Sequence, residues 1–334
     1  MAAADVAAEP GTARRYWLLA TVALTGLPLL VGLALWPVST DGTLPGLAWL
    51  LFVGSSVHVG ATGWFYSVAE VRAHLVANPA RYLWVPLVLV VILAGAAATL
   101  STRGLGWLLL GFFGWQFFHF QKQNLGLAAL AARGYGASGL TATERRALVA
   151  AGLGGTAALV GHPALLQVAG VTAHGWLFTA GAVVFVAGVL SGAACLSRRA
   201  AADRPGAFVT VYLLSSLFFL PVFCFASPYP AVAGLTIAHG LQYLLLMGLL
   251  AARPVKTRPA SVGLLMLLNI AIVTGLLLNW SSHLHGGNLA ARLVFGCYLG
   301  LSCAHFVVDA GLWRLRDDFP RRFLTARLPF LLGR

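Results

Sequence analysis

Apolar residues fill the chain in long runs, and short polar connections separate each run from the next. The runs are about 20 residues long, which lets an α-helix cross the hydrocarbon core of a bilayer. Thr141 and Glu144 have the spacing of a capping box, so we expect the fifth helix to begin near residue 142. The pattern predicts ten transmembrane helices, with spans 17–36, 47–67, 83–100, 105–127, 147–170, 175–196, 207–226, 230–251, 259–279 and 290–312.

The composition agrees with an all-α, polytopic membrane helix bundle. Of the 334 residues, 59% are hydrophobic and 9% are charged, whereas soluble domains carry about 25% charged residues. We expect a cytoplasmic N-terminal tail (1–16), a transmembrane domain (17–312) and a basic cytoplasmic C-terminal tail (313–334). The C-terminal tail suits the membrane interface, where arginines attract anionic headgroups, although a frayed tail is an equal alternative.

The basic residues predict the orientation of the chain. The formal net charge is +13, but these residues lie between apolar runs, a pattern that indicates membrane orientation and no nucleic-acid partner. The positive-inside rule places both termini in the cytoplasm of a multi-pass cell-membrane protein. Basic residues precede the first span and follow every even-numbered span, with Arg103 as the main exception. The residues that follow this pattern are Arg14, Arg15, Arg72, Arg81, Arg133, Arg145, Arg146, Arg198, Arg199, Arg204, Arg253, Lys256, Arg258, Arg314, Arg316, Arg321 and Arg322.

Four of the nine histidines lie well inside predicted spans: His58, His119, His239 and His305. Their spans are the second, fourth, eighth and tenth, which all run from outside to inside in the predicted topology. Counted from the outer end of each span, the four histidines lie at similar depth, between mid-membrane and the cytoplasmic half. Polar groups at this depth normally face a bundle interior or a wet cavity. We therefore expect the four imidazoles to share one site.

Polar companions lie one helical turn from these histidines, on the same helical face. The segment GWQFFHFQKQNLG, residues 114–126, carries several of them around His119. Lys122, Gln242 and Tyr243 are the candidate catalytic residues. Asp309 is either a fifth metal ligand or the acceptor that fixes the tautomer of a ligating histidine. Lys122 would balance a carboxylate or an oxyanion, and a snorkelling lysine is an equal alternative.

A metal centre is the chemistry that this pattern favours. Neutral imidazole is the commonest metal ligand in proteins, and four helices can bring four imidazoles to one ion. A single one of these histidines would be interpreted as making a hydrogen bond between helices. The set of four together favours a shared site. Non-haem iron is the expected ion, because iron with open coordination positions suits oxidation chemistry inside an apolar shell. Haem and other transition metals are alternatives.

Isolated histidines on several membrane helices resemble the pattern of the bacterial Brp/Blh-type β-carotene dioxygenases. The resemblance is carried by His58, His119, His239 and His305 and by the general architecture, without a long shared motif. It implies an all-helical membrane protein with iron held by histidines of separate helices. The expected activity is that of an oxygenase or oxidoreductase with a lipophilic substrate, and the expected partners are membrane lipid and an electron donor.

Two other functions stay open. A haem-binding electron-transfer protein would use two imidazoles of neighbouring helices, but the common arrangement of two spaced histidines on one helix is absent. A proton- or substrate-coupled transporter would use His, Asp and Lys as a relay between two parallel halves. Two features suggest such halves: His58 and His119 are 61 residues apart and His239 and His305 are 66 apart, with one span skipped in each pair, and FFHFQKQ and CAHFVVD share a His-Phe step. Walker A, nucleophile-elbow and H-E-x-x-H motifs are absent.

Overall fold

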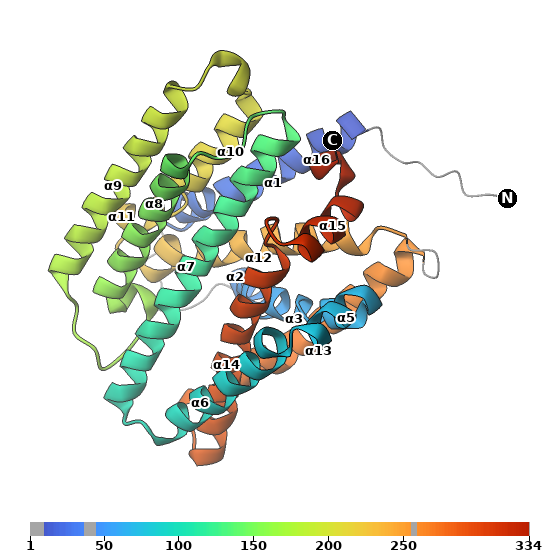
Figure 1. Ribbon diagram of the computed structural model, residues 1–334. Coiled ribbons are helices and arrows are strands. Elements are labelled where there is room, and N and C mark those ends of the chain that lie inside the picture. Colours follow the sequence, from blue (N-terminus) through green and yellow to red (C-terminus); the bar gives the residue numbers. More distant parts are fainter. Residues whose placement is uncertain (1–9, 37–44, 255–258, 334) are drawn as a thin grey trace.

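The computed structural model describes residues 10–36, 45–254 and 259–333, and this part of the chain folds into helices without a strand (Figure 1). Seven of its helical segments are long and apolar enough to cross a membrane. The predicted all-α class is thus confirmed, and the apolar helices are those of a membrane protein. Residues 1–9, Lys256 and Arg258, which entered the predicted topology, lie outside the described residues.

The first part of the bundle ends with its longest helix, α7. In chain order its elements are α1 (Pro10–Leu35), α2 (Pro45–Phe52), the π-helix η1 (Val53–Val57), α3 (His58–Ala61), α4 (Trp64–Ser67), α5 (Ala69–Ala77), the π-helix η2 (Ala80–Trp84), α6 (Val85–Thr99) and α7 (Thr102–Gly134). Residues 10–16, expected to belong to a tail, form the first turns of α1. Tyr135, directly after α7, donates a hydrogen bond from its hydroxyl to the carbonyl oxygen of Arg14 at 2.9 Å, which ties this end of α1 to α7.

The second part begins with a close helix pair, α8 and α9, and ends in two short helices. Its elements are α8 (Ala142–Gly161), η3 (Pro163–Leu166), α9 (Gly175–Ser197), η4 (Ala201–Asp203), α10 (Gly206–Ser216), α11 (Leu220–Cys224), the π-helix η5 (Tyr229–Ala233), α12 (Gly234–Ala251), α13 (Ala260–Ser282), η6 (Leu284–Gly286), α14 (Leu289–Leu312), α15 (Asp318–Arg327) and α16 (Pro329–Leu332). The capping box at Thr141 and Glu144 is present, as predicted.

Each of the ten predicted spans coincides with helical structure, but three of them lie outside the seven long apolar segments. The span 105–127 lies inside the longer and more polar α7. The span 147–170 ends early, at Gly161, because Pro163 follows and cannot continue the helix. The span 207–226 is interrupted after α10, and Pro221 begins the short α11.

The central helices are α12 and α14, most of whose residues are buried, whereas fewer than a third of the residues of α1, α6, α9 and α13 are buried. The leucines, valines and isoleucines exposed on these outer helices suit contact with lipid. α12 packs against α1, η1, α3 and α13, and α14 packs along α6. The polar residues that α12 and α14 carry are therefore held inside the protein.

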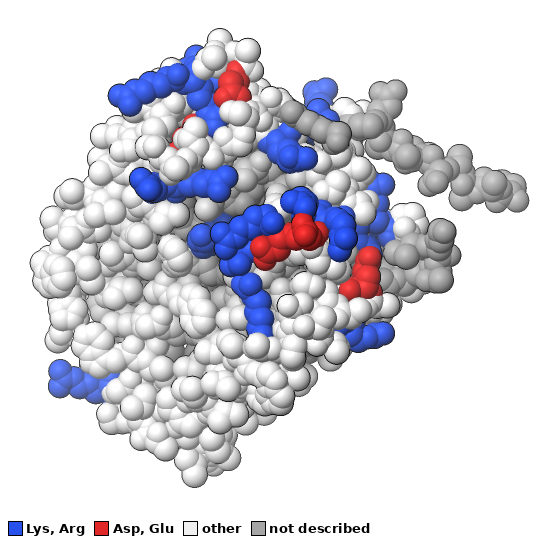
Figure 2. All heavy atoms as spheres, in the orientation of Figure 1, with Lys and Arg blue, Asp and Glu red and all other residues white. Residues whose placement is uncertain are grey.

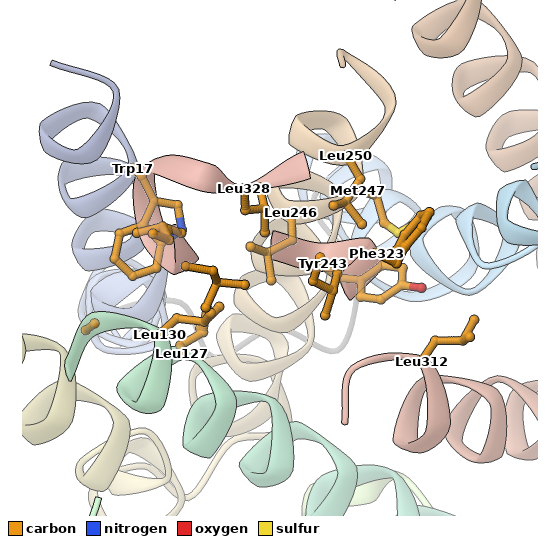
Figure 3. Packing of buried hydrophobic residues seen from close by; sticks show 14 of the residues in the cluster. Trp17, Leu127, Leu130, Tyr243, Leu246, Met247, Leu250, Leu312, Phe323 and Leu328 are labelled. Carbon is orange, nitrogen blue, oxygen red and sulfur yellow. The ribbon is translucent and has the colours of Figure 1, made fainter. Parts of the chain in front are cut away.

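The C-terminal segment is a packed part of the bundle. Phe323, Leu324 and Leu328 are buried, and Figure 3 shows Phe323 and Leu328 among α12 side chains such as Leu246 and Leu250. Arg253 also donates from Nε to the carbonyl oxygen of Arg327 at 3.0 Å. The tail expected at 313–334 is thus neither frayed nor laid only against lipid, because its apolar side chains cover one end of the bundle.

An ion-pair network joins the ends of α8 and α9. Arg199 lies 2.6 Å from Glu144 and 2.8 Å from Asp203, and the Glu144 side chain is buried. Burial raises the pKa of the Glu144 carboxyl, but the hydrogen bonds from Arg199 and Thr141 outweigh this effect, so that pKa lies below its usual value. The ionised form is therefore favoured in the folded protein.

Glu144→Gln should lower the thermal stability of the detergent-solubilised protein at pH 7. A carboxyl group with a depressed folded-state pKa contributes stability above its unfolded pKa of about 4.3, and this contribution is lost as the pH falls through the folded value. The difference in Tm between wild type and variant should therefore shrink below about pH 4.3. Asp317→Asn, at an exposed ion pair with Arg316, is the control and should change Tm little. An equal Tm for Glu144→Gln and wild type at pH 7 would contradict the assignment.

Candidate metal centre

The imidazoles of His58, His119, His239 and His305, here called the histidine cluster, meet inside the bundle. They come from α3, α7, α12 and α14. The ring centroid of His58 lies 4.8 Å from that of His239 and 5.1 Å from that of His305, and the ring centroid of His119 lies 5.1 Å and 5.0 Å from the same two. Their exposed fractions range from 0% for His239 to 9% for His119. The structure thus brings together the four histidines that the sequence singled out.

Most ring nitrogens of the histidine cluster are buried without a hydrogen bond of normal geometry to any described residue. These are both nitrogens of His58, both of His239, Nε2 of His119 and Nε2 of His305. A buried polar group without a partner costs about 1–3 kcal/mol, so six of them at one point do not fit a structural hydrogen-bonding role. Nitrogens left free in this way are suited to ligate a metal ion.

Two overlapping sets of ligand atoms have the spacing of a metal site. One set comes from His58, His239 and His305, and the other from His119, His305 and Asp309, with the atoms of each set within 4.8 Å of one another. This limit is slightly wider than the roughly 3–4 Å that separates imidazole nitrogens bound to one ion at about 2.0–2.1 Å. His305 belongs to both sets and is the shared ligand candidate.

A chain of hydrogen bonds orients His305. Thr62 Oγ1 lies 2.6 Å from Nδ1 of His305 and 2.8 Å from the hydroxyl of Tyr243, which donates to Oδ1 of Asp309 at 2.9 Å. Asp309 Oδ2 is 3.7 Å from Nδ1 of His305. These contacts occupy the Nδ1 side of the ring, and Nε2 is buried without a hydrogen-bond partner among the described residues. An outer hydrogen-bonding shell of this kind fixes the tautomer and direction of a ligating histidine.

Gln242 lies among other amides and away from the imidazoles. Its Nε2 donates to Thr25 Oγ1 at 2.9 Å and lies 3.4 Å from Asn124 Oδ1, while its Oε1 accepts from Gln123 Nε2 at 2.9 Å. Gln123 also donates to the carbonyl oxygen of His239 at 2.9 Å. The candidate catalytic residue Gln242 therefore joins α1, α7 and α12, and its partner Gln123 bonds the backbone of His239.

Lys122 lies outside the histidine cluster. Its side chain is exposed, because Gln123, and not Lys122, continues the face of His119 toward α12. The neighbouring Gln121 is buried and donates to the carbonyl oxygen of Leu148 at 2.8 Å, which joins α7 to α8. The amides of this polar segment thus hold helices together around His119, whereas its lysine points away.

Two phenylalanines cover the histidine cluster. Phe120 stacks on His239 with ring centroids 3.9 Å apart, and Phe306 stacks on His119 at 4.6 Å. Both are buried and form an apolar cover on the imidazoles of His239 and His119. Each follows a cluster histidine directly in the sequence, and this shared His-Phe step is the signal by which both could have been found.

Local backbone features bring α12 close to the helix of His58. The π-helix η1 ends one residue before His58 and contains Gly54. A Cβ added to Gly240 would lie 2.3 Å from the carbonyl oxygen and 2.5 Å from the Cα of Gly54. Only glycine permits this approach, which positions His239 beside His58. π-helical segments recur at functional sites in other proteins.

The chain matches no protein-family model, no curated protein and no solved structure. The chemistry of the histidine cluster therefore has to be argued from its own residues and their surroundings.

Proposed function

We propose that this protein is an integral membrane, metal-dependent oxidoreductase or oxygenase acting on a lipophilic substrate. The observation that carries the proposal is the convergence of four buried histidines from four helices, with six ring nitrogens that make no hydrogen bond of normal geometry to a described residue. Non-haem iron is the ion we propose, because imidazole suits iron and the bound metal would supply redox chemistry. Zinc and copper also favour such ligands.

The residues around the proposed centre have distinct roles. His58, His119, His239 and His305 would hold the ion, and Asp309 would act through Thr62 and Tyr243 on the ring of His305. The Tyr243 hydroxyl holds a proton between Thr62 and Asp309 and is a candidate proton donor. Phe120 and Phe306 would exclude water. A substrate that reaches this site from the bilayer has to be lipophilic, in line with the resemblance to carotenoid dioxygenases.

The spacing of the imidazoles favours a single ion over haem. The ring centroids of neighbouring imidazoles lie about 5 Å apart. A flat macrocycle placed between two of these rings would displace the other two. A proton relay for transport would instead need its buried groups linked by hydrogen bonds or water. Six imidazole nitrogens do not make such hydrogen bonds to described residues.

Elemental analysis and an absorption spectrum of the detergent-purified protein test the proposal. We expect a transition metal at near-stoichiometric amount, without a Soret band, and oxygen consumption when a lipophilic polyene such as β-carotene is supplied. A Soret band would establish haem in its place. Absence of any bound transition metal after purification without chelators would overturn the proposal and favour the transporter.

We further propose that all ten predicted spans cross the cell membrane with both termini in the cytoplasm. Two observations support this topology. Lys and Arg side chains gather over the upper part of the view in Figure 2, whereas its lower part is almost free of them. The α9–α10 connection lies at the top of the same view and the α13–α14 connection at the bottom (Figure 1).

In a variant without the four native cysteines, Gly286→Cys should react with a membrane-impermeant maleimide on intact cells, and Ala201→Cys should react only after lysis. Both positions are exposed, and the added Cβ at Gly286 meets no atom within 4 Å. The expected result follows from the positive-inside rule, which places the basic α9–α10 connection in the cytoplasm. The reverse labelling pattern would overturn the orientation, and labelling of both from outside would overturn the alternation of spans.

A further inference from the structure

A groove on the outer wall of the bundle, between α7 and α8, brings three cations together. Lys122 of α7 and Arg145 and Arg146 of α8 line a hollow of about 370 Å³. All three side chains are exposed. The rest of the lining is apolar: Leu125, Val149, Ala150 and Leu153. The groove therefore has positive charge beside an apolar wall, and it lies apart from the histidine cluster.

No carboxylate lines this groove among the described residues. Glu144 is adjacent in sequence, but both of its oxygens accept from Arg199 at 2.6 Å. Among the described residues, Arg145 donates from Nε to the carbonyl oxygen of Leu140 at 3.1 Å, and its terminal amino groups are left for another acceptor. The three charges thus favour an anion that the protein itself does not provide.

The apolar wall indicates that this anion carries a hydrocarbon chain. Leu153, one turn beyond Val149 on α8, is 47% exposed, and an exposed leucine on a membrane helix faces lipid. Basic pockets between membrane helices recognise phosphate headgroups by charge, and an apolar wall beside them fits an acyl chain. A snorkelling lysine alone does not account for the convergence of Lys122 with two arginines from another helix.

We propose that the α7–α8 groove binds an anionic phospholipid, with the phosphate held by Lys122, Arg145 and Arg146 and an acyl chain along Leu125, Val149 and Leu153. The bound lipid packs α7 against α8. This site is independent of the proposed metal chemistry, because none of its residues belongs to the histidine cluster. It also gives a role to the charged residue of GWQFFHFQKQNLG that the cluster does not use.

Native mass spectrometry of the full-length protein, titrated in detergent with phosphatidylglycerol or phosphatidylcholine, tests the proposal. We expect one tightly bound phosphatidylglycerol and no comparable binding of phosphatidylcholine. The triple variant Lys122→Gln/Arg145→Gln/Arg146→Gln should weaken this binding roughly 100-fold, because each basic residue near an anionic lipid contributes about fivefold. Lys122→Arg keeps the charge and should retain the binding.

A matched control removes three charges elsewhere. Arg15, Arg72 and Arg198 are exposed residues of other connections and do not line the groove. The variant Arg15→Gln/Arg72→Gln/Arg198→Gln should bind phosphatidylglycerol like wild type. Equal weakening in both triple variants would mean general surface attraction and would overturn the site. Displacement of the lipid by an equal concentration of inorganic phosphate would also overturn it, because the acyl chain would then add nothing.

Single substitutions keep the test decisive if the triple variant does not fold. Lys122→Gln and Arg146→Gln should each weaken phosphatidylglycerol binding about fivefold while the melting temperature without added lipid stays near that of wild type. Unchanged lipid binding in both single variants would overturn the proposal.

Discussion

His305→Ala should yield a folded membrane protein that no longer retains its metal. His305 is the one histidine found in both sets of ligand atoms, and its Nε2 lacks a hydrogen-bond partner among the described residues. Its removal therefore takes a ligand from either arrangement of the ion. Metal per folded protein, measured on the monodisperse fraction after size exclusion, should fall to background. Oxygen consumption with a lipophilic substrate should fall with it.

The control for this variant is His162→Ala. His162 ends α8 and contacts Phe178, away from the histidine cluster, so its loss should leave the metal content unchanged. A structural role for His305 predicts the opposite behaviour: a lower melting temperature with the same metal content per folded molecule. Unchanged metal content in His305→Ala would therefore remove this residue from the centre.

Asp309→Asn distinguishes an orienting carboxylate from a ligand. The substitution keeps the shape of the side chain and an oxygen that can accept from Tyr243, but it removes the negative charge. Outer-shell partners of metal-binding histidines contribute about 10–100-fold to metal affinity, and the contacts of Asp309 with Tyr243 and His305 favour this role. A loss of metal as complete as that of His305→Ala would instead identify Asp309 as a ligand.

The helical class and the convergence of the four histidines could both be anticipated from the sequence, for related reasons. Apolar runs of spanning length report membrane helices directly, because lipid imposes both their length and their composition. Histidines at similar depth in such helices face the bundle interior and not lipid, so they are expected to lie near one another. Depth and polarity are thus enough to group His58, His119, His239 and His305, although they leave the bound ion open.

Spacing along a helix was a weaker guide to individual contacts. Thr62 follows His58 by one turn, yet its hydroxyl contacts His305 of α14. The π-helix η1 ends just before His58. A π-helix departs from the period of 3.6 residues per turn by which the residues on one helical face are predicted. At α7, Lys122 and Gln123 both lie one turn after His119, and only the packing of α12 determines that Gln123 turns inward.

The C-terminal segment shows a second limit of sequence reasoning. Composition leaves an interfacial segment and a frayed tail as equal alternatives, whereas Phe323, Leu324 and Leu331 are buried in the structure. An amphipathic segment gains the same hydrophobic stabilisation from lipid as from its own bundle, so composition alone does not separate the two. In the structure the segment packs on the bundle, and Arg14 donates a hydrogen bond to the carbonyl oxygen of Phe330 at 3.1 Å.

Gly240→Ala should destabilise the bundle and weaken metal binding together. The added Cβ would lie 2.3 Å from a backbone oxygen of Gly54, an atom that cannot rotate away. α12 would therefore have to shift away from η1, which would move His239 away from His58. Overpacking of this kind costs about 1–3 kcal/mol, and occasionally more.

Gly248 lies on the same helix with no atom within 4 Å of an added Cβ, so Gly248→Ala should keep the wild-type Tm or raise it slightly. Thermal unfolding and metal content of both detergent-purified variants give the comparison. Wild-type Tm and metal content in Gly240→Ala would show that the close contact of α12 with η1 does not position the histidine cluster.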